Sequence, residues 1–103
     1  MPNENNMSLL KYILKEEDNP LSDYTVRIWN DKIDEFERNY RKYKTDLLKK
    51  RPLYADAEEE LKRYRNGEIT LYSIVRNPDN ILRNIILLMP LDLKEIEWKI
   101  KNK

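Results

Sequence analysis

A series of apolar residues spaced three and four apart constrains this chain more than any other feature of its sequence. The series consists of Val26, Trp29, Ile33, Phe36, Tyr40, Tyr43 and Leu47. Steps of three and four keep side chains on one side of an α-helix. The spacing therefore predicts one long helix near residues 23–50. Ser22 or Asp23 can cap its start, and Pro52 ends it.

We interpret this series as a stripe that faces the core of the same chain. If Val26 is placed at heptad position a, the d positions hold Trp29, Phe36 and Tyr43. Parallel coiled-coil dimers favour leucine at d, because a compact side chain fits the facing hole and large rings do not. Shorter helices of the same chain are therefore expected to pack on the stripe.

Two shorter helices are predicted on either side of the long one. Residues 8–17 carry apolar positions at helical spacing, and they follow a polar segment, residues 1–6, that we expect to be disordered. Asp56 and Glu59 have capping-box spacing and predict the start of another helix. Gly67, the only glycine, stands where a left-handed C-terminal cap would end that helix.

Two later segments are ambiguous between helix and strand. Residues 69–75 contain strand-favouring side chains, but Thr70 can cap a short helix there, and we prefer the helix. Residues 95–101 are apolar at alternate positions as well as at helical spacing. If both segments were strands, they would pair in a small sheet and the class would become α+β.

The most apolar part of the chain follows the Asn77-Pro78 dipeptide. Asn77 and Pro78 predict a helix start, because asparagine caps helices and proline suits the first turn. The helix is expected to reach about Met89, and apolar residues around most of its circumference predict that it is the buried centre. Asp92 and Glu95 then repeat the capping-box spacing and predict a final helix.

Together these patterns predict an all-α fold of about five helices in one domain, residues 1–103, with the helix near residues 23–50 as its spine. A chain of 103 residues can build a single core but leaves much of its surface exposed. Self-association is a natural way to bury more of that surface.

The composition excludes several kinds of enzyme. The chain has no Cys and no His, so it offers no thiol nucleophile, no Ser-His relay and no zinc site of the usual kind. Carboxylate clusters at residues 16–18, 31–35 and 58–60 each suit a helix end or an exposed face. We therefore predict no enzyme, no catalytic residue, no metal and no cofactor.

The remaining composition suggests a source and a location. High Lys, Glu, Ile and Tyr without Gln or Cys is typical of thermophile proteins, while eleven Asn are typical of AT-rich genomes. In composition the chain resembles small proteins of viruses that infect thermophilic archaea. No leader peptide or membrane span is visible, and the expected location is the cytoplasm, that of the host cell if the protein is viral.

The face of the long helix opposite the stripe is acidic in its first half and basic in its second. This order suits the helix dipole without any partner. It also predicts a homodimer in which two helices lie antiparallel, acidic half against basic half. Stripe aromatics that stay exposed would anchor a partner. We assign the predicted partner or dimer interface to Trp29, Asp31, Asp34, Glu35, Arg38, Tyr40, Arg41, Lys42 and Lys49.

Protein–protein interaction, as an adaptor or inhibitor of host machinery, is the function that these features favour, and nucleic-acid binding is the alternative. A basic stripe could follow a phosphate backbone. Its residues are Arg38, Arg41, Lys42, Lys49, Lys50, Arg51, Lys62, Arg63 and Arg65. The acids within residues 56–60, which interrupt the stripe, and the absence of a recognisable nucleic-acid-binding motif weigh against this alternative.

Overall fold

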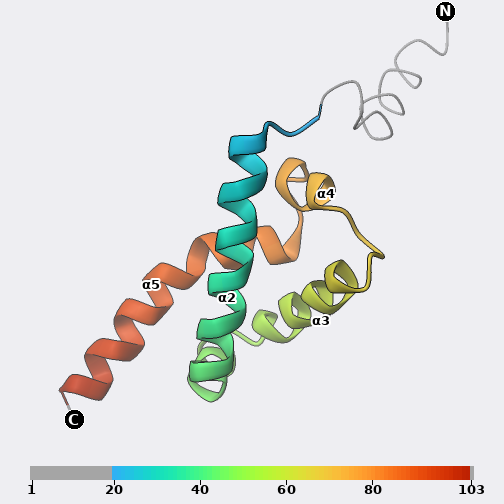
Figure 1. Cartoon of the computed structure of the whole chain (residues 1–103). Helices are drawn as coiled ribbons and strands as arrows, with labels where there is room; N and C mark the ends of the chain where they lie inside the picture. The colour runs from blue at the N-terminus through green and yellow to red at the C-terminus, as the bar shows by residue number, and fades with distance from the viewer. Residues whose placement is uncertain (1–19, 103) are drawn as a thin grey trace, which may run out of the picture.

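The computed structural model describes residues 20–102, and that part of the chain is helical throughout apart from short connections (Figure 1). Its elements are α2 (Asp23–Lys50), α3 (Leu53–Arg65), α4 (Leu71–Arg76) and α5 (Ile81–Lys101). No strand occurs among the described residues, so the all-α class is confirmed for them and the alternative sheet is wrong. The helix predicted over residues 8–17 and the disorder expected for residues 1–6 lie outside the described residues.

Helix α2 has the bounds that its apolar stripe predicts. The Ser22 hydroxyl caps it by accepting a hydrogen bond from the Thr25 N–H at 3.1 Å. The helix ends at Lys50, and Tyr43, with φ −119° and ψ 25°, places a kink inside it. Its buried residues are Ile33, Phe36, Tyr40 and Leu47. All four belong to the stripe, which therefore faces the core as interpreted.

Helix α3 starts earlier than its capping-box spacing predicts. It begins at Leu53, after Pro52, whose φ of −57° already suits a first helical turn. Asp56 therefore lies inside the first turn, where its charge suits the helix dipole, and does not cap the helix. The end of α3 matches the prediction, because Gly67 follows it with a φ of +79°.

One of the two helix caps predicted in this region is confirmed and the other is wrong. Thr70 caps α4 as predicted, accepting from the Ser73 N–H at 3.1 Å. Asn77, the predicted cap of the next helix, instead accepts from the Asp79 N–H in a tight turn. Asn80 caps α5, because its side-chain oxygen accepts from the Arg83 N–H at 2.8 Å.

Helix α5 is a single element where the sequence predicts two. It continues through Pro90, whose ring nitrogen has no hydrogen for the bond to the Ile86 carbonyl. Burial explains the continuity, since Met89 before the proline and Asp92 and Ile96 after it all lie on the face that packs on the core. The capping role predicted for Asp92 is therefore wrong, because this residue is inside a helix and buried.

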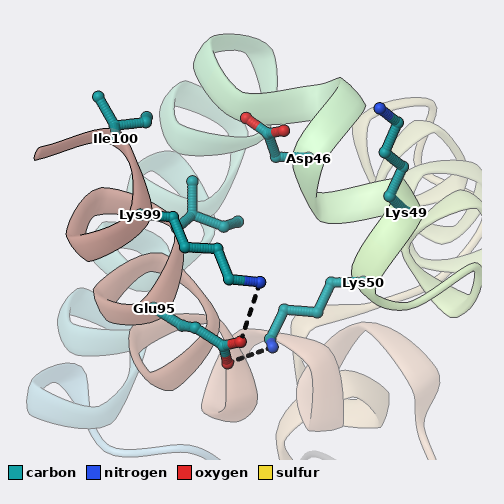
Figure 2. Close-up of a pocket in the computed structure, with 7 residues that line it drawn as sticks. Asp46, Lys49, Lys50, Glu95, Lys99 and Ile100 are labelled. Atoms are coloured by element: carbon teal, nitrogen blue, oxygen red, sulfur yellow. Dashed lines mark hydrogen bonds and ion pairs between the residues drawn. The ribbon is translucent and has the colours of Figure 1, made fainter. Parts of the chain in front are cut away.

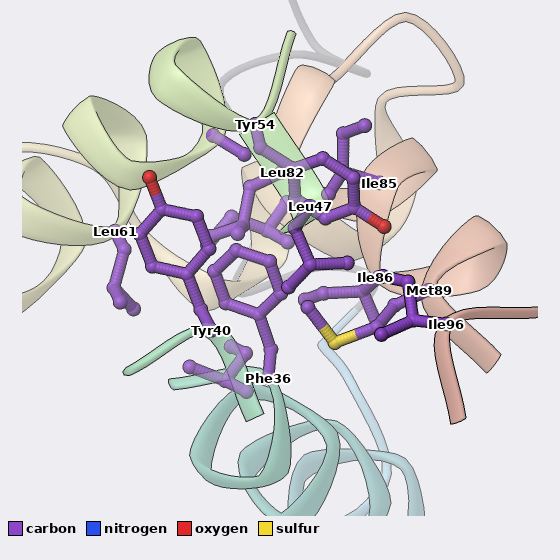
Figure 3. Packing of buried hydrophobic residues seen from close by; sticks show 13 residues of the cluster. Phe36, Tyr40, Leu47, Tyr54, Leu61, Leu82, Ile85, Ile86, Met89 and Ile96 are labelled. Carbon is purple, nitrogen blue, oxygen red and sulfur yellow. The ribbon is translucent and has the colours of Figure 1, made fainter. Parts of the chain in front are cut away.

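The core lies where α2, α3 and α5 meet (Figure 3). Three near-parallel rings form part of it, with Phe36 5.7 Å from Tyr40 and 6.5 Å from Tyr54 between ring centroids. Helix α5 supplies more buried residues than α2, and each of these two helices contacts all three others. The central position predicted for the long helix is thus shared with α5.

Candidate functional site

The outer face of α2 is exposed along its whole length. It consists of Tyr24, Arg27, Asp31, Asp34, Glu35, Arg38, Arg41, Lys42, Thr45 and Lys49, every one of them exposed. The charged members of the predicted interface thus lie on one accessible surface. Two are held within the chain: Asp34 accepts from Arg65 of α3 at 2.9 Å, and Arg41 donates to Glu37 at 2.7 Å.

The two aromatic residues predicted as interface anchors differ in burial, because Tyr40 is buried and Trp29 is only partly buried. Tyr40 is 3% exposed, and its hydroxyl donates to Glu58 at 3.1 Å, so its assignment to a partner surface is wrong. Burial, and then the charge and the hydrogen bond of Glu58, raise the pKa of Tyr40 to about 12. Trp29 is only half-buried and packs against the core, with the Lys32 ammonium 5.9 Å from its ring.

The basic stripe of the nucleic-acid alternative is largely engaged in ion pairs. Five of its residues pair with carboxylates inside the chain: Arg41, Lys50, Arg51, Lys62 and Arg65. The other members, Arg38, Lys42, Lys49 and Arg63, are exposed and form no ion pair within residues 20–102. The structure therefore divides the predicted stripe and leaves fewer cations available for phosphates.

A row of exposed apolar residues follows the outer face of α5. Leu87, Leu91 and Trp98 are 47%, 67% and 64% exposed. Steps of four and seven place them on the same side of a helix, with Lys94 and Lys101 between and after them. We call these five residues the α5 stripe. The sequence prediction missed it, because a break at Pro90 would remove the common register of Leu87 and Trp98.

A groove separates the C-terminal ends of α2 and α5 (Figure 2). Its volume is about 520 Å³, and its lining consists of Asp46, Lys49, Lys50, Glu95, Ile96, Lys99 and Ile100. Glu95 accepts from Lys50 and, at 3.4 Å, from Lys99, and these two contacts lower the pKa of its carboxyl. Among the charged side chains of the groove, Glu95 pairs with Lys50 and Lys99, whereas Asp46 and Lys49 form no ion pair within residues 20–102.

A buried polar cluster joins α3 to α5. Asp92 is 1% exposed, and its Oδ2 accepts from the Tyr54 hydroxyl at 2.7 Å and from Arg51 Nε at 2.8 Å. Burial, and then the hydrogen bond to Asp92, raise the pKa of Tyr54, while the same carboxylate raises the pKa of Arg51. Because the phenol stays protonated and the carboxylate is enclosed, the cluster positions helices and offers no reactive group to a substrate.

Neither a metal-binding cluster nor a membrane-spanning helix occurs in the described part of the chain. Residues 20–102 contain no group of three or more carboxylates that could hold a metal ion. None of the four described helices is long and apolar enough to cross a membrane.

Comparison of the chain with protein-family models, with curated proteins and with solved structures finds no match.

Proposed function

We propose that this chain binds a protein partner through the α5 stripe and catalyses no reaction. The observation that carries the proposal is the alignment of Leu87, Leu91 and Trp98, each about half exposed or more, on one helix face. Aligned apolar side chains on a surface mark interaction sites more often than scattered ones do. Tryptophan in particular is enriched among the residues that contribute most to binding.

The charges on the α5 stripe indicate what the partner surface is like. Lys94 and Lys101 lie among the apolar residues, whereas the exposed acids Glu95 and Glu97 lie to either side of the stripe. A second copy of the same stripe would bring lysine against lysine. The stripe therefore fits an acidic surface of a different protein, such as an amphipathic helix with leucine-like anchors and flanking carboxylates.

A role as adaptor or inhibitor agrees with this kind of surface. A chain without His, Cys or a glycine-rich loop has little catalytic equipment, so occupying another protein is the simplest use of it. A viral or plasmid origin, and action in the host cytoplasm, remain part of the proposal and depend on composition alone.

The proposal can be tested by affinity capture from host extract in the presence of nuclease. We expect the wild-type chain to retain a protein that the Leu91→Ser/Trp98→Ser variant loses at least tenfold. Leu53→Ser is the matched control, because Leu53 is a 43% exposed leucine at the start of α3, away from the stripe. Equal capture by both variants, or no captured protein, would contradict the proposal.

The same experiment distinguishes the alternative functions. Nucleic acid retained before nuclease treatment and lost steeply with salt would favour the basic residues of α2 and α3. Turnover of any substrate by the purified chain would overturn the non-enzymatic assignment. Neither alternative has a structural observation in its favour that compares with the α5 stripe.

A further inference from the structure

We infer that the outer face of α2 pairs with the same face of a second copy, antiparallel and in one register. This self-association is separate from the partner proposed for the α5 stripe, because it uses another helix and a different kind of contact. It is carried by the order of charges along α2 and by their lack of ion-pair partners within the described chain.

Six charges form one ridge along the outward side of α2, and the last of them, Asp46, also lines the groove between α2 and α5. In chain order the members of the ridge are Arg27, Asp31, Glu35, Arg38, Lys42 and Asp46. Successive members are three or four residues apart, so they are neighbours on the helix surface. Their signs read plus, minus, minus, plus, plus, minus. When this order is reversed, every sign becomes its opposite, so the ridge is complementary to itself only in the antiparallel direction.

One register satisfies all of these charges at once. A two-fold axis between residues 36 and 37 places Arg27 opposite Asp46, Asp31 opposite Lys42, and Glu35 opposite Arg38. Symmetry repeats each pair, which makes a closed, isologous interface. The same register places exposed Tyr24 opposite Lys49, where an ammonium can lie over a ring.

Neighbouring registers place like charges together. If one helix slides by four residues in one direction, Asp31 faces Asp46. Sliding by four residues in the other direction makes Arg27 face Lys42. A parallel arrangement places every charge opposite its own copy. Like charges in contact cost free energy, so the charge order selects one register among these.

The ridge is also distinguished by what its members do within the chain. All six are exposed, and none forms an ion pair within residues 20–102. By contrast, Asp34 and Arg41, on the same outer face, pair with Arg65 and Glu37. The charges of this face that already pair within the chain thus lie outside the ridge.

The kink at Tyr43 identifies the best positions for a test. Asp46 lies beyond the kink, whereas the central residues Asp31, Glu35, Arg38 and Lys42 all precede it. We therefore choose Asp31 and Lys42. Exposed ion pairs contribute little each, so we expect a weak dimer that is visible at high protein concentration and low salt.

The test is sedimentation equilibrium of the full chain and charge variants. Asp31→Lys and Lys42→Asp each place two like-charged contacts in the interface, and each should weaken dimerisation by about tenfold or more. The double variant Asp31→Lys/Lys42→Asp restores opposite charges and should recover the wild-type dimer. Glu97→Lys makes the same change in net charge as Asp31→Lys, at an exposed site on α5, and should leave the dimer unchanged.

The outcomes separate the two proposals. A wild-type chain that stays monomeric at low salt overturns the inference and leaves the α5 stripe untouched. A dimer that Asp31→Lys does not weaken places the interface elsewhere, and a double variant that stays monomeric shows that the register is wrong. Circular dichroism should show the same helix content for all variants, since these side chains make no ion pair within the described chain.

Discussion

At the scale of single residues, two buried tyrosine hydroxyls differ in whether they have a hydrogen-bond partner. The Tyr54 hydroxyl donates to the enclosed carboxylate of Asp92 at 2.7 Å. The Tyr72 hydroxyl is also buried, but it has no hydrogen-bond partner in the described structure. Both residues are 6% exposed or less, so the two tyrosines differ in their partners more than in their burial.

We therefore expect the same substitution to have different effects on stability at these two positions. Tyr54→Phe leaves Asp92 with one donor fewer and should lower the free energy of unfolding by about 1–3 kcal/mol. Tyr72→Phe removes a hydroxyl that gains nothing from the fold and should leave stability within about 0.5 kcal/mol or increase it. Urea denaturation measures both. An equal loss at the two sites would show that the Asp92 contact contributes nothing.

The buried tyrosines also predict how stability depends on pH. Burial and Glu58 raise the pKa of Tyr40 to about 12, above the unfolded value of 10.0, and burial and Asp92 raise the pKa of Tyr54. A raised folded pKa means that the folded state holds the proton more tightly. Its contribution is therefore complete below pH 10 and is lost as the pH rises through the folded pKa.

Alkaline unfolding should reveal this contribution. We expect the wild-type chain to lose about 2 kcal/mol or more of unfolding free energy between about pH 10 and 12. Tyr40→Phe should show a shallower loss over that interval, with the last part of the tyrosinate absorbance rise diminished. A slope identical to that of the wild type would mean that Tyr40 ionises without cost.

At the scale of elements, local signals predicted α2 and α4 because nothing distant competes with them. The apolar stripe, the capping Ser22 and the following proline of α2 each act on residues within a few positions of themselves. The predicted start of α3 at Asp56 was wrong, because Pro52 allows the helix to begin earlier. The capping role predicted for Asp92 was wrong, because its side chain is held by hydrogen bonds from Arg51 and Tyr54. These donors are 41 and 38 residues away along the chain.

Pro90 is the clearest case in which packing overrides a local signal. A proline inside a helix removes one backbone hydrogen bond and crowds the preceding turn. Helix α5 continues because Met89 and Asp92 are buried on the same face on either side of it. Packing thus holds together an element that the local sequence would divide.

Replacing this proline should accordingly stabilise the protein. Pro90→Ala returns a donor to the Ile86 carbonyl, and we expect the free energy of unfolding to rise by about 1 kcal/mol or more. Thermal denaturation would show this as a higher midpoint. A lower midpoint would mean that the proline sets the path that brings Asp92 to Arg51.

At the scale of the whole molecule, two outer faces differ in what they offer. The ridge on α2 carries three acids, three bases and no apolar residue, whereas the α5 stripe carries three apolar residues among lysines. The sequence predicted the central charges of the ridge, because acids precede bases there within one predicted helix. It did not assign Arg27 or Asp46 to the interface. It could not predict the second face, because the stripe exists only when α5 continues through Pro90.

The two faces should act independently, since each lies on the side of its helix that points away from the shared core. In a chain bearing Leu91→Ser/Trp98→Ser, the dimerisation constant should stay within about twofold of wild type, because the α2 ridge is unchanged.

Salt should affect the dimer and the core of the fold differently. At about 1 M salt the Debye length falls to about 3 Å, so the dimer should dissociate. The helix content should persist, because the core of α2, α3 and α5 is mainly apolar and a salt that is not a denaturant does not weaken the burial of apolar side chains. Sedimentation and circular dichroism on the same samples measure the two effects, and a loss of helix content together with the dimer would mean that the fold itself depends on the second copy.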